Sequence, residues 1–140
     1  MKIDRYLSYL ILGIILIASL GVVYIVINPA PSERFTEFYI LGEDGKAGNY
    51  PTNLTIGDNG TVIIGIVNHE GAPASYQLNI SLNNNTLKEE SFNLQNSEKK
   101  EIYFTFNANQ TGNQSLKFYL YKLPVTQNAY RFLELMINVD

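Results

Sequence analysis

Residues 74–82 read ASYQLNISL, the clearest indication of fold class in the sequence. Its apolar and polar residues alternate, so that the two kinds of side chain fall on opposite faces of an extended chain. The apolar members are Tyr76, Leu78, Ile80 and Leu82. Such alternation is typical of an antiparallel strand with one buried and one solvated face. The stretch therefore predicts one strand of an all-β domain.

The same period of two recurs further along the chain. The apolar members of two further alternating segments are Ile102, Phe104, Phe106, Leu116, Phe118 and Leu120. Residues 62–67 are an almost unbroken apolar run, which favours a central strand. Asn, Asp and Gly clusters separate these segments. The pattern predicts an immunoglobulin-like β-sandwich of seven to eight strands. They lie at about 35–41, 53–57, 61–69, 74–82, 86–94, 99–107, 115–123 and 130–139.

The N-terminal part of the chain has a different character. Residues 6–27 carry no charge, and fourteen of them are Leu, Ile or Val. Because a helix of this length reaches about 33 Å, the segment predicts one transmembrane helix. Lys2 and Arg5 precede it, so the positive-inside rule places residues 1–5 in the cytoplasm as a short tail. We therefore expect a single-pass protein of the cell membrane with its C-terminal domain outside.

The alternative for this segment is a cleaved signal peptide, whose apolar core ordinarily has about 7–15 residues and ends in a small-x-small site. The core here is longer, and the nearest such site, after Ala30, is followed by Pro31. We therefore favour an uncleaved signal anchor. Residues 28–32 contain two prolines and predict a stiff stalk of about 15 Å, which leaves residues 33–140 as the outer β-sandwich domain.

Composition narrows the function classes. Lys and Arg number 10 against 13 Asp and Glu, and no basic cluster offers a footing for nucleic acid. Cysteine is absent, which excludes disulfides and thiol nucleophiles. The single histidine, His69, has Glu70 beside it, but adjacent residues of a strand point to opposite faces. We expect no metal or other cofactor and no enzymatic activity.

Two further patterns have an ordinary and a functional interpretation. The loop at residues 42–48 contains Glu43 and Asp44 but lacks the carboxylate spacing of the known calcium loop, which favours a glycine-rich hairpin. Paired carboxylates occur at residues 89–90 and at residues 98 and 101. Lysines surround both pairs, and catalysis would need a cleft to hold them, so a solvated face is the favoured interpretation.

Glycosylation signals are frequent beyond the apolar segment. The Asn-x-Ser/Thr pattern occurs at Asn53, Asn59, Asn79, Asn84, Asn109 and Asn113. Such sequons belong on the surface of proteins outside the cytoplasm, and they support an outer location independently of the charge rule. An Asn-rich chain also produces sequons by chance, so the six are candidate sites of a glycoprotein.

Strand parity predicts an outward apolar stripe. If the apolar residues of 116–120 face the core, Tyr119 and Tyr121 face out, and the closing strand likewise turns Phe132 and Met136 outward. The last two strands of a sandwich are usually neighbours, which would join the four residues. Exposed Tyr, Phe and Met are enriched at protein interfaces, so this stripe is a candidate partner face. The alternatives are a cover provided by the 42–52 hairpin or the membrane, or a parity that buries the stripe.

Residues 31–140 resemble the soluble domain of an archaeal membrane-protein family, domain of unknown function 1616. The elements that carry the resemblance are Phe35-Thr36-Glu37-Phe38-Tyr39, Pro51-Thr52-Asn53-Leu54-Thr55, Gly57, Gly60-Thr61, Val67-Asn68-His69-Glu70 and Tyr119-Leu120-Tyr121-Lys122. The resemblance implies an archaeal source and an outward-facing, CARDB-like sandwich domain. It implies no activity and no functional residue. Family members often have several transmembrane helices before this domain, whereas one is expected here.

These observations favour two hypotheses about function over a third, an envelope enzyme, which would need a deep acidic cleft. The first is a membrane-anchored cell-surface protein with a non-catalytic binding or structural sandwich domain, which contacts a protein or glycan in the envelope or forms a homo-oligomer. The second is an accessory subunit of a larger archaeal membrane complex. Both have the lipid bilayer as one partner and a protein contact near its surface.

Overall fold

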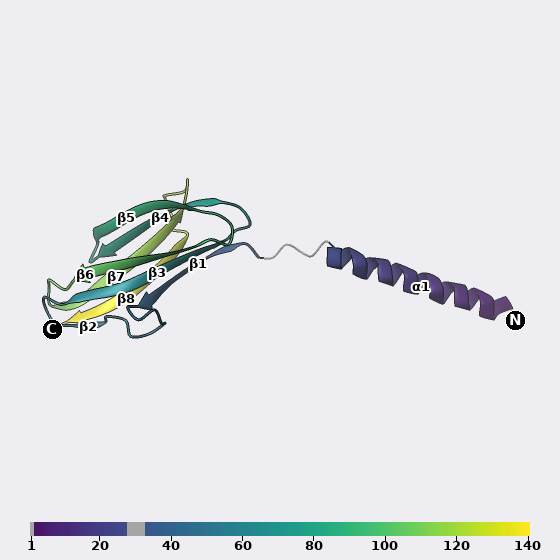
Figure 1. Ribbon diagram of the computed structural model, residues 1–140, viewed down its shortest axis with the longest axis horizontal. Coiled ribbons are helices and arrows are strands. Elements are labelled where there is room, and N and C mark those ends of the chain that lie inside the picture. The colour runs from purple at the N-terminus through teal and green to yellow at the C-terminus, as the bar shows by residue number, and fades with distance from the viewer. Residues whose placement is uncertain (1, 28–32) are drawn as a thin grey trace. The chain divides into compact units, whose positions relative to one another are not determined.

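The computed structural model describes residues 2–27 and 33–140. The chain divides into two units, one containing helix α1 (Lys2–Ile27) and the other running from Arg34 to Asp140 (Figure 1). The stalk predicted at 28–32 lies outside the described residues.

Helix α1 is long and apolar enough over Asp4–Ile27 to cross a membrane. None of this stretch is buried against the described protein, and Ile17 and Val26 each expose more than 70% of their surface. The helix begins at Lys2, four residues before the predicted start, so the basic N-terminal residues are helical. The first turn also includes a 2.8 Å hydrogen bond from the Ser8 hydroxyl to the Asp4 carbonyl.

The second unit consists of eight strands in two sheets. They are β1 (Phe35–Gly42), β2 (Asn53–Leu54), β3 (Asn59–His69), β4 (Ala74–Leu82), β5 (Asn85–Leu94), β6 (Lys99–Asn107), β7 (Gly112–Lys122) and β8 (Arg131–Val139). One sheet has the order β1–β3–β6 and the other β2–β8–β7–β4–β5 (Figure 1). All pairs are antiparallel except β2 with β8. This confirms the predicted all-β, immunoglobulin-like sandwich.

The core lies between the sheets and follows the predicted parity. Strand β3, the predicted central strand, has β1 and β6 as neighbours. The fully buried apolar side chains include Val62, Ile64, Ile66, Tyr76, Leu78, Ile80, Leu116, Phe118 and Leu120. Burial of each such side chain stabilises the fold by about 1.5–3 kcal/mol relative to exposure. The alternating sequence thus becomes two apolar inner faces.

Two of the predicted strands have a bound that differs from the structure by three residues, and the other bounds agree within two residues. Strand β2 covers only residues 53–54, because Gly57 has a φ of +95° and the Asp58 carboxylate accepts a hydrogen bond from the Thr55 amide. These contacts turn the chain where the prediction had a strand through residue 57. Strand β7 begins at Gly112, three residues early, since its first residues pair with the end of β8.

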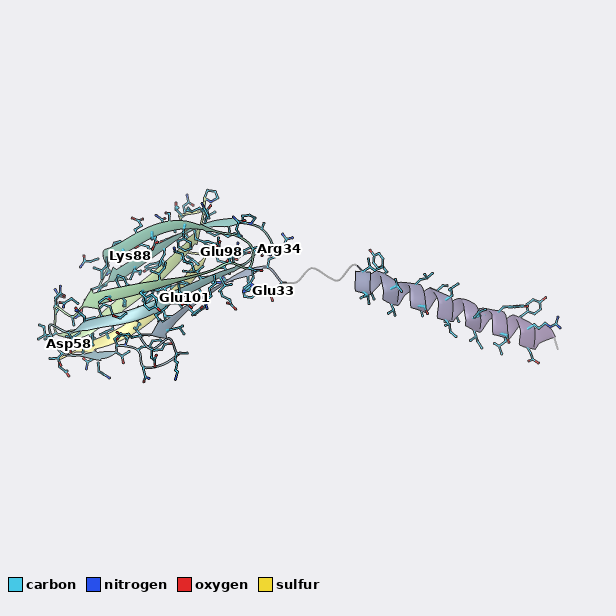
Figure 2. The ribbon with its side chains drawn as sticks, viewed as in Figure 1. Glu33, Arg34, Asp58, Lys88, Glu98 and Glu101 are labelled. Atoms are coloured by element: carbon cyan, nitrogen blue, oxygen red, sulfur yellow. The ribbon has the colours of Figure 1, made fainter. Side chains whose placement is uncertain are left out.

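Because of the strand directions, the loops lie at two opposite ends of the sandwich. We call the end where β1 begins the entry end; it also holds the loops at residues 70–73, 95–98 and 123–130. The opposite, far end holds the connections at 43–58, 83–84 and 108–111, together with the C-terminal residue. Arg34 and Glu98 lie at the entry end and Asp58 at the far end (Figure 2). The candidate residues His69 and Glu70 therefore lie at the entry end, and the candidate loop at 42–48 lies at the far end.

Candidate functional site: an aromatic sheet face and a buried carboxylate

The outer side of the five-stranded sheet carries a cluster of aromatic rings. Tyr119 of β7 stands directly opposite Phe132 of β8, and their ring centroids are 5.1 Å apart. Tyr121 stacks on Tyr119 at 6.5 Å. Phe132 exposes 47% of its surface, whereas Leu135 on the opposite face of the same strand is buried. We call Tyr119, Tyr121, Phe132 and the outward Met136 the aromatic face.

The aromatic face is interrupted and bordered by polar side chains. Met136 exposes 54% of its surface but stands opposite Ser115, and the facing pair Lys117 and Glu134 separates it from the rings. On the other side of β7, Asn79 of β4 is the partner of Tyr119. The three rings therefore form the apolar centre, with Met136 as an outlying member. An apolar centre with a polar rim is the usual arrangement of a protein interface.

A second constellation surrounds Glu70, which follows β3 at the entry end and exposes 8% of its surface. Its Oε2 accepts hydrogen bonds from the hydroxyls of Thr36, at 2.8 Å, and Tyr130, at 2.7 Å. Lys122 Nζ lies 3.4 Å from Oε1. Since the Thr36 proton goes to the carboxylate, the Tyr76 hydroxyl, 2.8 Å from Thr36 Oγ1, donates to that oxygen.

These contacts set the protonation states of the cluster. Burial on its own raises the pKa of Glu70, but the hydrogen bonds from Tyr130 and Thr36 and the charge of Lys122 outweigh it and hold that pKa below the ordinary 4.5. Burial raises the pKa of Tyr76 above the usual 10.0. Burial and the hydrogen bond to Glu70 likewise raise the pKa of Tyr130 above the usual 10.0. The carboxylate is therefore ionised and the phenols are neutral donors at neutral pH.

The Glu70 cluster ties the two sheets together. Thr36 belongs to β1 of the three-stranded sheet, whereas Tyr76 and Lys122 belong to β4 and β7 of the other. The buried Asn68 fixes the turn before it, because its Oδ1 accepts a 2.8 Å bond from the Glu70 amide. Every polar atom of this carboxylate has a partner, so the cluster acts as a structural clamp.

A pocket of about 380 Å³ opens beside this clamp at the entry end. It is lined by Lys122, Val125, Asn128, Ala129 and Tyr130. Lys122 Nζ lies 5.5 Å from the centre of the Tyr130 ring, and the Arg131 guanidinium lies 4.5 Å from it. The hydroxyl of Tyr130 thus bonds Glu70, and its ring contacts two cationic side chains of the same chain.

The predicted separation of His69 from its neighbour Glu70 is confirmed. The His69 ring stacks on Phe35 with centroids 4.8 Å apart, and its Nε2 lies 3.6 Å from Glu37. Glu70 points the other way, into the cluster. In the loop at 42–48, the Asp44 carboxylate accepts a 3.1 Å bond from the Lys46 amide and is used within its own turn. Residues 2–27 and 33–140 contain no group of three or more side chains suited to hold a metal.

Three of the four paired carboxylates lie on strands at the protein surface, whereas Glu98 lies in the turn before β6 and accepts a 2.8 Å hydrogen bond from the Gln95 amide. Glu90 stands 3.7 Å from both Lys88 and Lys100, and Glu101 lies 2.9 Å from Lys99. Glu89 accepts a 2.8 Å hydrogen bond from the Gln77 amide. Surface pairs of this kind contribute little to stability.

The sequons divide into two groups in the structure. The asparagines at 53, 59, 84, 109 and 113 are exposed, and all five lie at the far end of the sandwich. Asn79 lies in the middle of β4, is half-buried, and has its side-chain oxygen shielded from solvent. The strand parity gave Asn79 an outward direction, which the structure keeps, but the neighbouring side chains cover part of it.

Sequence reasoning missed the Glu70 cluster. Its members are far apart along the chain, with Thr36 34 residues before Glu70 and Tyr130 60 residues after it. A carboxylate at the end of an apolar strand, before a glycine, was the one local signal for a buried acid. The residues near Glu70 in the sequence do not indicate which distant side chains bind its carboxylate.

Comparison with solved structures shows the same fold in proteins of remote sequence. The CARDB domain of a Pyrococcus furiosus protein, solved in complex with di-metal ions, is 14% identical, with 79% of this chain and 96% of that chain covered at a TM-score of 0.60. Native α2-macroglobulin of Escherichia coli is 11% identical over 76% of this chain and 17% of its own, at 0.57. A β-glucosidase of Listeria innocua in complex with glucose is 13% identical over 76% and 16%, at 0.50.

No curated protein matches the sequence. The model of the family described as Domain of unknown function (DUF1616) matches residues 29–138, nearly the whole β-sandwich unit. Along the chain, an apolar N-terminal helix thus precedes two sheets with a CARDB-like arrangement. The chain belongs to the DUF1616 family.

Proposed function

We propose that this chain is a membrane-anchored cell-surface protein whose β-sandwich is a non-catalytic binding module. In this proposal α1 is an uncleaved single span with its N-terminus in the cytoplasm, and the sandwich lies outside. The module binds a protein at the membrane surface through the aromatic face. The proposal assigns no reaction to the chain.

The membrane part of the proposal is supported by the composition of α1. The candidate span Asp4–Ile27 covers 24 residues, about 36 Å of helix, and its uncharged core from residue 6 to 27 is long enough to cross the hydrocarbon core of a bilayer. Lys2 and Arg5 precede the apolar core, and an excess of positive charge marks the cytoplasmic side. The aliphatic side chains of the helix are exposed in this structure and need lipid or other helices around them.

One observation carries the binding part: the ring cluster of Tyr119, Tyr121 and Phe132 lies on the outer side of the sheet without serving the core. The rings pack on one another, whereas Leu116 and Phe118 belong to the core. Aromatic side chains supply much of the binding free energy in protein interfaces. A surface of this kind is suited to a protein partner.

The binding proposal is tested by crosslinking on intact source cells, followed by mild detergent purification of the full chain. The double variant Tyr119→Ser/Tyr121→Ser is expected to fold but to lose the crosslinked partner. The matched control is Tyr103→Ser, which changes a tyrosine that is 67% exposed on the three-stranded sheet. Loss of the partner in both variants, or in neither, would reject the aromatic face as the binding surface.

The orientation is tested separately, and the absence of native cysteine makes this simple. Cysteine introduced at the exposed Gln127 is expected to react with a membrane-impermeant maleimide on intact cells. Cysteine introduced at Asp4 is expected to react only after the cells are opened. The reverse labelling pattern would place the sandwich inside.

The second candidate is an accessory subunit of a larger membrane complex. It is supported by the exposed apolar surface of α1, which could pack against helices of a polytopic partner as readily as against lipid. Stoichiometric co-purification with such a protein would favour this candidate. Crosslinks only to a second copy or to envelope proteins would favour the independent surface module.

We propose no metal site. The Pyrococcus CARDB domain was solved with di-metal ions, but the parts of this chain that the structure describes bring together no three acidic or histidine side chains. Its one deeply buried carboxylate, Glu70, is already bound by two hydroxyls and an ammonium group. This donor set suits a structural clamp and leaves no open coordination position.

A further inference from the structure

The sequons are distributed unevenly over the sandwich. Five of the six have their asparagines at the far end, whereas the entry-end loops at 70–73, 95–98 and 123–130 contain none. The exception is Asn79, in the middle of β4. The fold therefore converts a scattered sequence pattern into a cluster at one end.

The far-end sequons differ in how open their acceptor groups are. Glycan transfer to a sequon involves the asparagine amide and the hydroxyl two residues later. Both residues are exposed in three sequons: Asn53 with Thr55, Asn84 with Thr86, and Asn109 with Thr111. All three lie in or beside turns or short edge segments.

Asn84 lies in an exposed turn. Asn83 and Asn84 connect β4 to β5 as a two-residue turn, and both have positive φ, 50° and 69°. Tight hairpins require this conformation, which asparagine tolerates. The side chain of Asn84 makes no hydrogen bond within the described residues, whereas that of Asn83 bonds the Ser115 amide. The turn thus leaves the Asn84 amide available.

The remaining far-end sequons are more engaged. Asn59 Oδ1 accepts a 2.9 Å bond from Asn107, and its sequon hydroxyl on Thr61 is 2.9 Å from that of Thr105. In the sequon of Asn113, the Ser115 hydroxyl is shielded from solvent.

Asn79 is the least suited. Its side-chain oxygen is buried, and Ser81, which completes the sequon, exposes only 7% of its surface. Asn79 is also the strand partner of Tyr119, so a glycan there would cover the rings of the aromatic face.

We infer that N-linked glycans are attached at Asn53, Asn84 and Asn109 and that Asn79 is left unmodified. The inference rests on the proposed function, because glycosylation needs the sandwich to be outside. The far end is then covered by glycan, while the aromatic face stays open for a partner. Glycosylation also confines the approach of that partner to the side of the sandwich and its entry end.

The chemistry needs a lipid-phosphate-linked oligosaccharide and a host transferase. The side-chain nitrogen of asparagine forms a bond to the anomeric carbon of the first sugar, and the bond from that carbon to the phosphate oxygen breaks. The lipid phosphate leaves with the bonding electrons, and one amide proton passes to a base. No oxidation or reduction takes place.

The test is intact-glycopeptide mass spectrometry of the full chain purified from source cells. Chymotryptic cleavage after Leu82 separates the Asn79 peptide from the Asn84 peptide. Thr86→Ala and Thr111→Ala each remove a sequon but keep the asparagine, and each is expected to lose one glycan mass. The matched control Ser81→Ala removes the Asn79 sequon and is expected to lose none.

Glycans at residues 53, 84 and 109, with none at 79, would support the inference. A glycan at Asn79, or modification confined to Asn59 and Asn113, would overturn it. Unmodified peptides from a chain whose Gln127→Cys variant is labelled on intact cells would overturn the glycan inference alone. Unmodified peptides together with labelling only after lysis would instead show that the proposed outer location has failed.

Discussion

The Tyr130 hydroxyl donates a 2.7 Å hydrogen bond to the carboxylate of Glu70, a residue 60 positions earlier in the chain. This bond fastens the long loop between β7 and β8 to the end of β3, and therefore one sheet to the other. The same loop joins the two strands that carry the aromatic face, β7 with Tyr119 and Tyr121 and β8 with Phe132 and Met136. The Glu70 cluster includes Lys122 at the end of β7 and Tyr130 just before β8, so it holds the two strands on which the geometry of the aromatic face depends.

The first prediction concerns this bond. Tyr130→Phe removes the donor and leaves a buried carboxylate with one hydroxyl fewer, so the free energy of unfolding should fall by about 1.5–3 kcal/mol. Thermal or chemical unfolding of the full chain in detergent measures the loss. Tyr103→Phe is the control, because the Tyr103 side chain is 67% exposed and should change stability by no more than about 0.5 kcal/mol. Equal stability of the two variants would show that the Tyr130–Glu70 hydrogen bond contributes nothing.

The second prediction is a pH dependence with two limbs. The folded pKa of Glu70 lies below its ordinary 4.5, so its contribution is complete above that value and is lost as the pH falls through the folded pKa. The folded pKa values of Tyr76 and Tyr130 lie above 10.0, so their contribution is complete below pH 10 and is lost as the pH rises through the folded values. Unfolding measured from pH 3 to 11 should show both losses. In Glu70→Gln the acid limb should flatten, and an unchanged limb would contradict the assignment.

The third prediction concerns Gly65 in β3. A β-carbon at this position would overlap the ring of Tyr39, its partner on β1. Gly65→Ala should therefore cost about 1–3 kcal/mol, as overpacking does. Adding Tyr39→Ala should make the same glycine change nearly neutral, and a double-mutant cycle measures the coupling. An unchanged cost in the Tyr39→Ala background would rule out the ring as the cause.

The fourth prediction compares two phenylalanines that lie on opposite sides of the five-stranded sheet. Phe118 is fully buried, so Phe118→Ala should lower the free energy of unfolding by about 3–5 kcal/mol. Phe132 is 47% exposed on the aromatic face, and Phe132→Ala should cost about 1 kcal/mol or less. Denaturant unfolding of the two variants decides the matter. A larger loss for Phe132 would mean that the aromatic face serves folding instead of binding.

Strand parity could be predicted from the sequence because each side-chain direction follows from its neighbours. The alternation of Leu116, Phe118 and Leu120 with Tyr119 and Tyr121 fixed which residues enter the core, and the structure buries the first three completely. The pairing of β7 with β8 also matched the expectation. These features depend on local periodicity and on a general topology of sandwiches.

The remaining features are non-local. The Glu70 cluster depends on contacts between residues 34 to 60 positions apart, which no local pattern encodes. The interruption of the aromatic face by Lys117 and Glu134 depends on the register of β7 and β8. The shortening of β2 follows from a turn around Gly57 that competes with the strand. The collection of sequons at one end needs the complete topology.

The most direct test of the central claim is site-specific photo-crosslinking in intact cells. A photoreactive phenylalanine analogue replaces Phe132 in one full-length variant and Tyr103 in another, which places matched probes on the outer sides of the two sheets. We expect Phe132 to give one adduct of defined mass and Tyr103 to give none. Adducts of the same mass from both positions, or none from Phe132, would contradict a binding surface on β7 and β8.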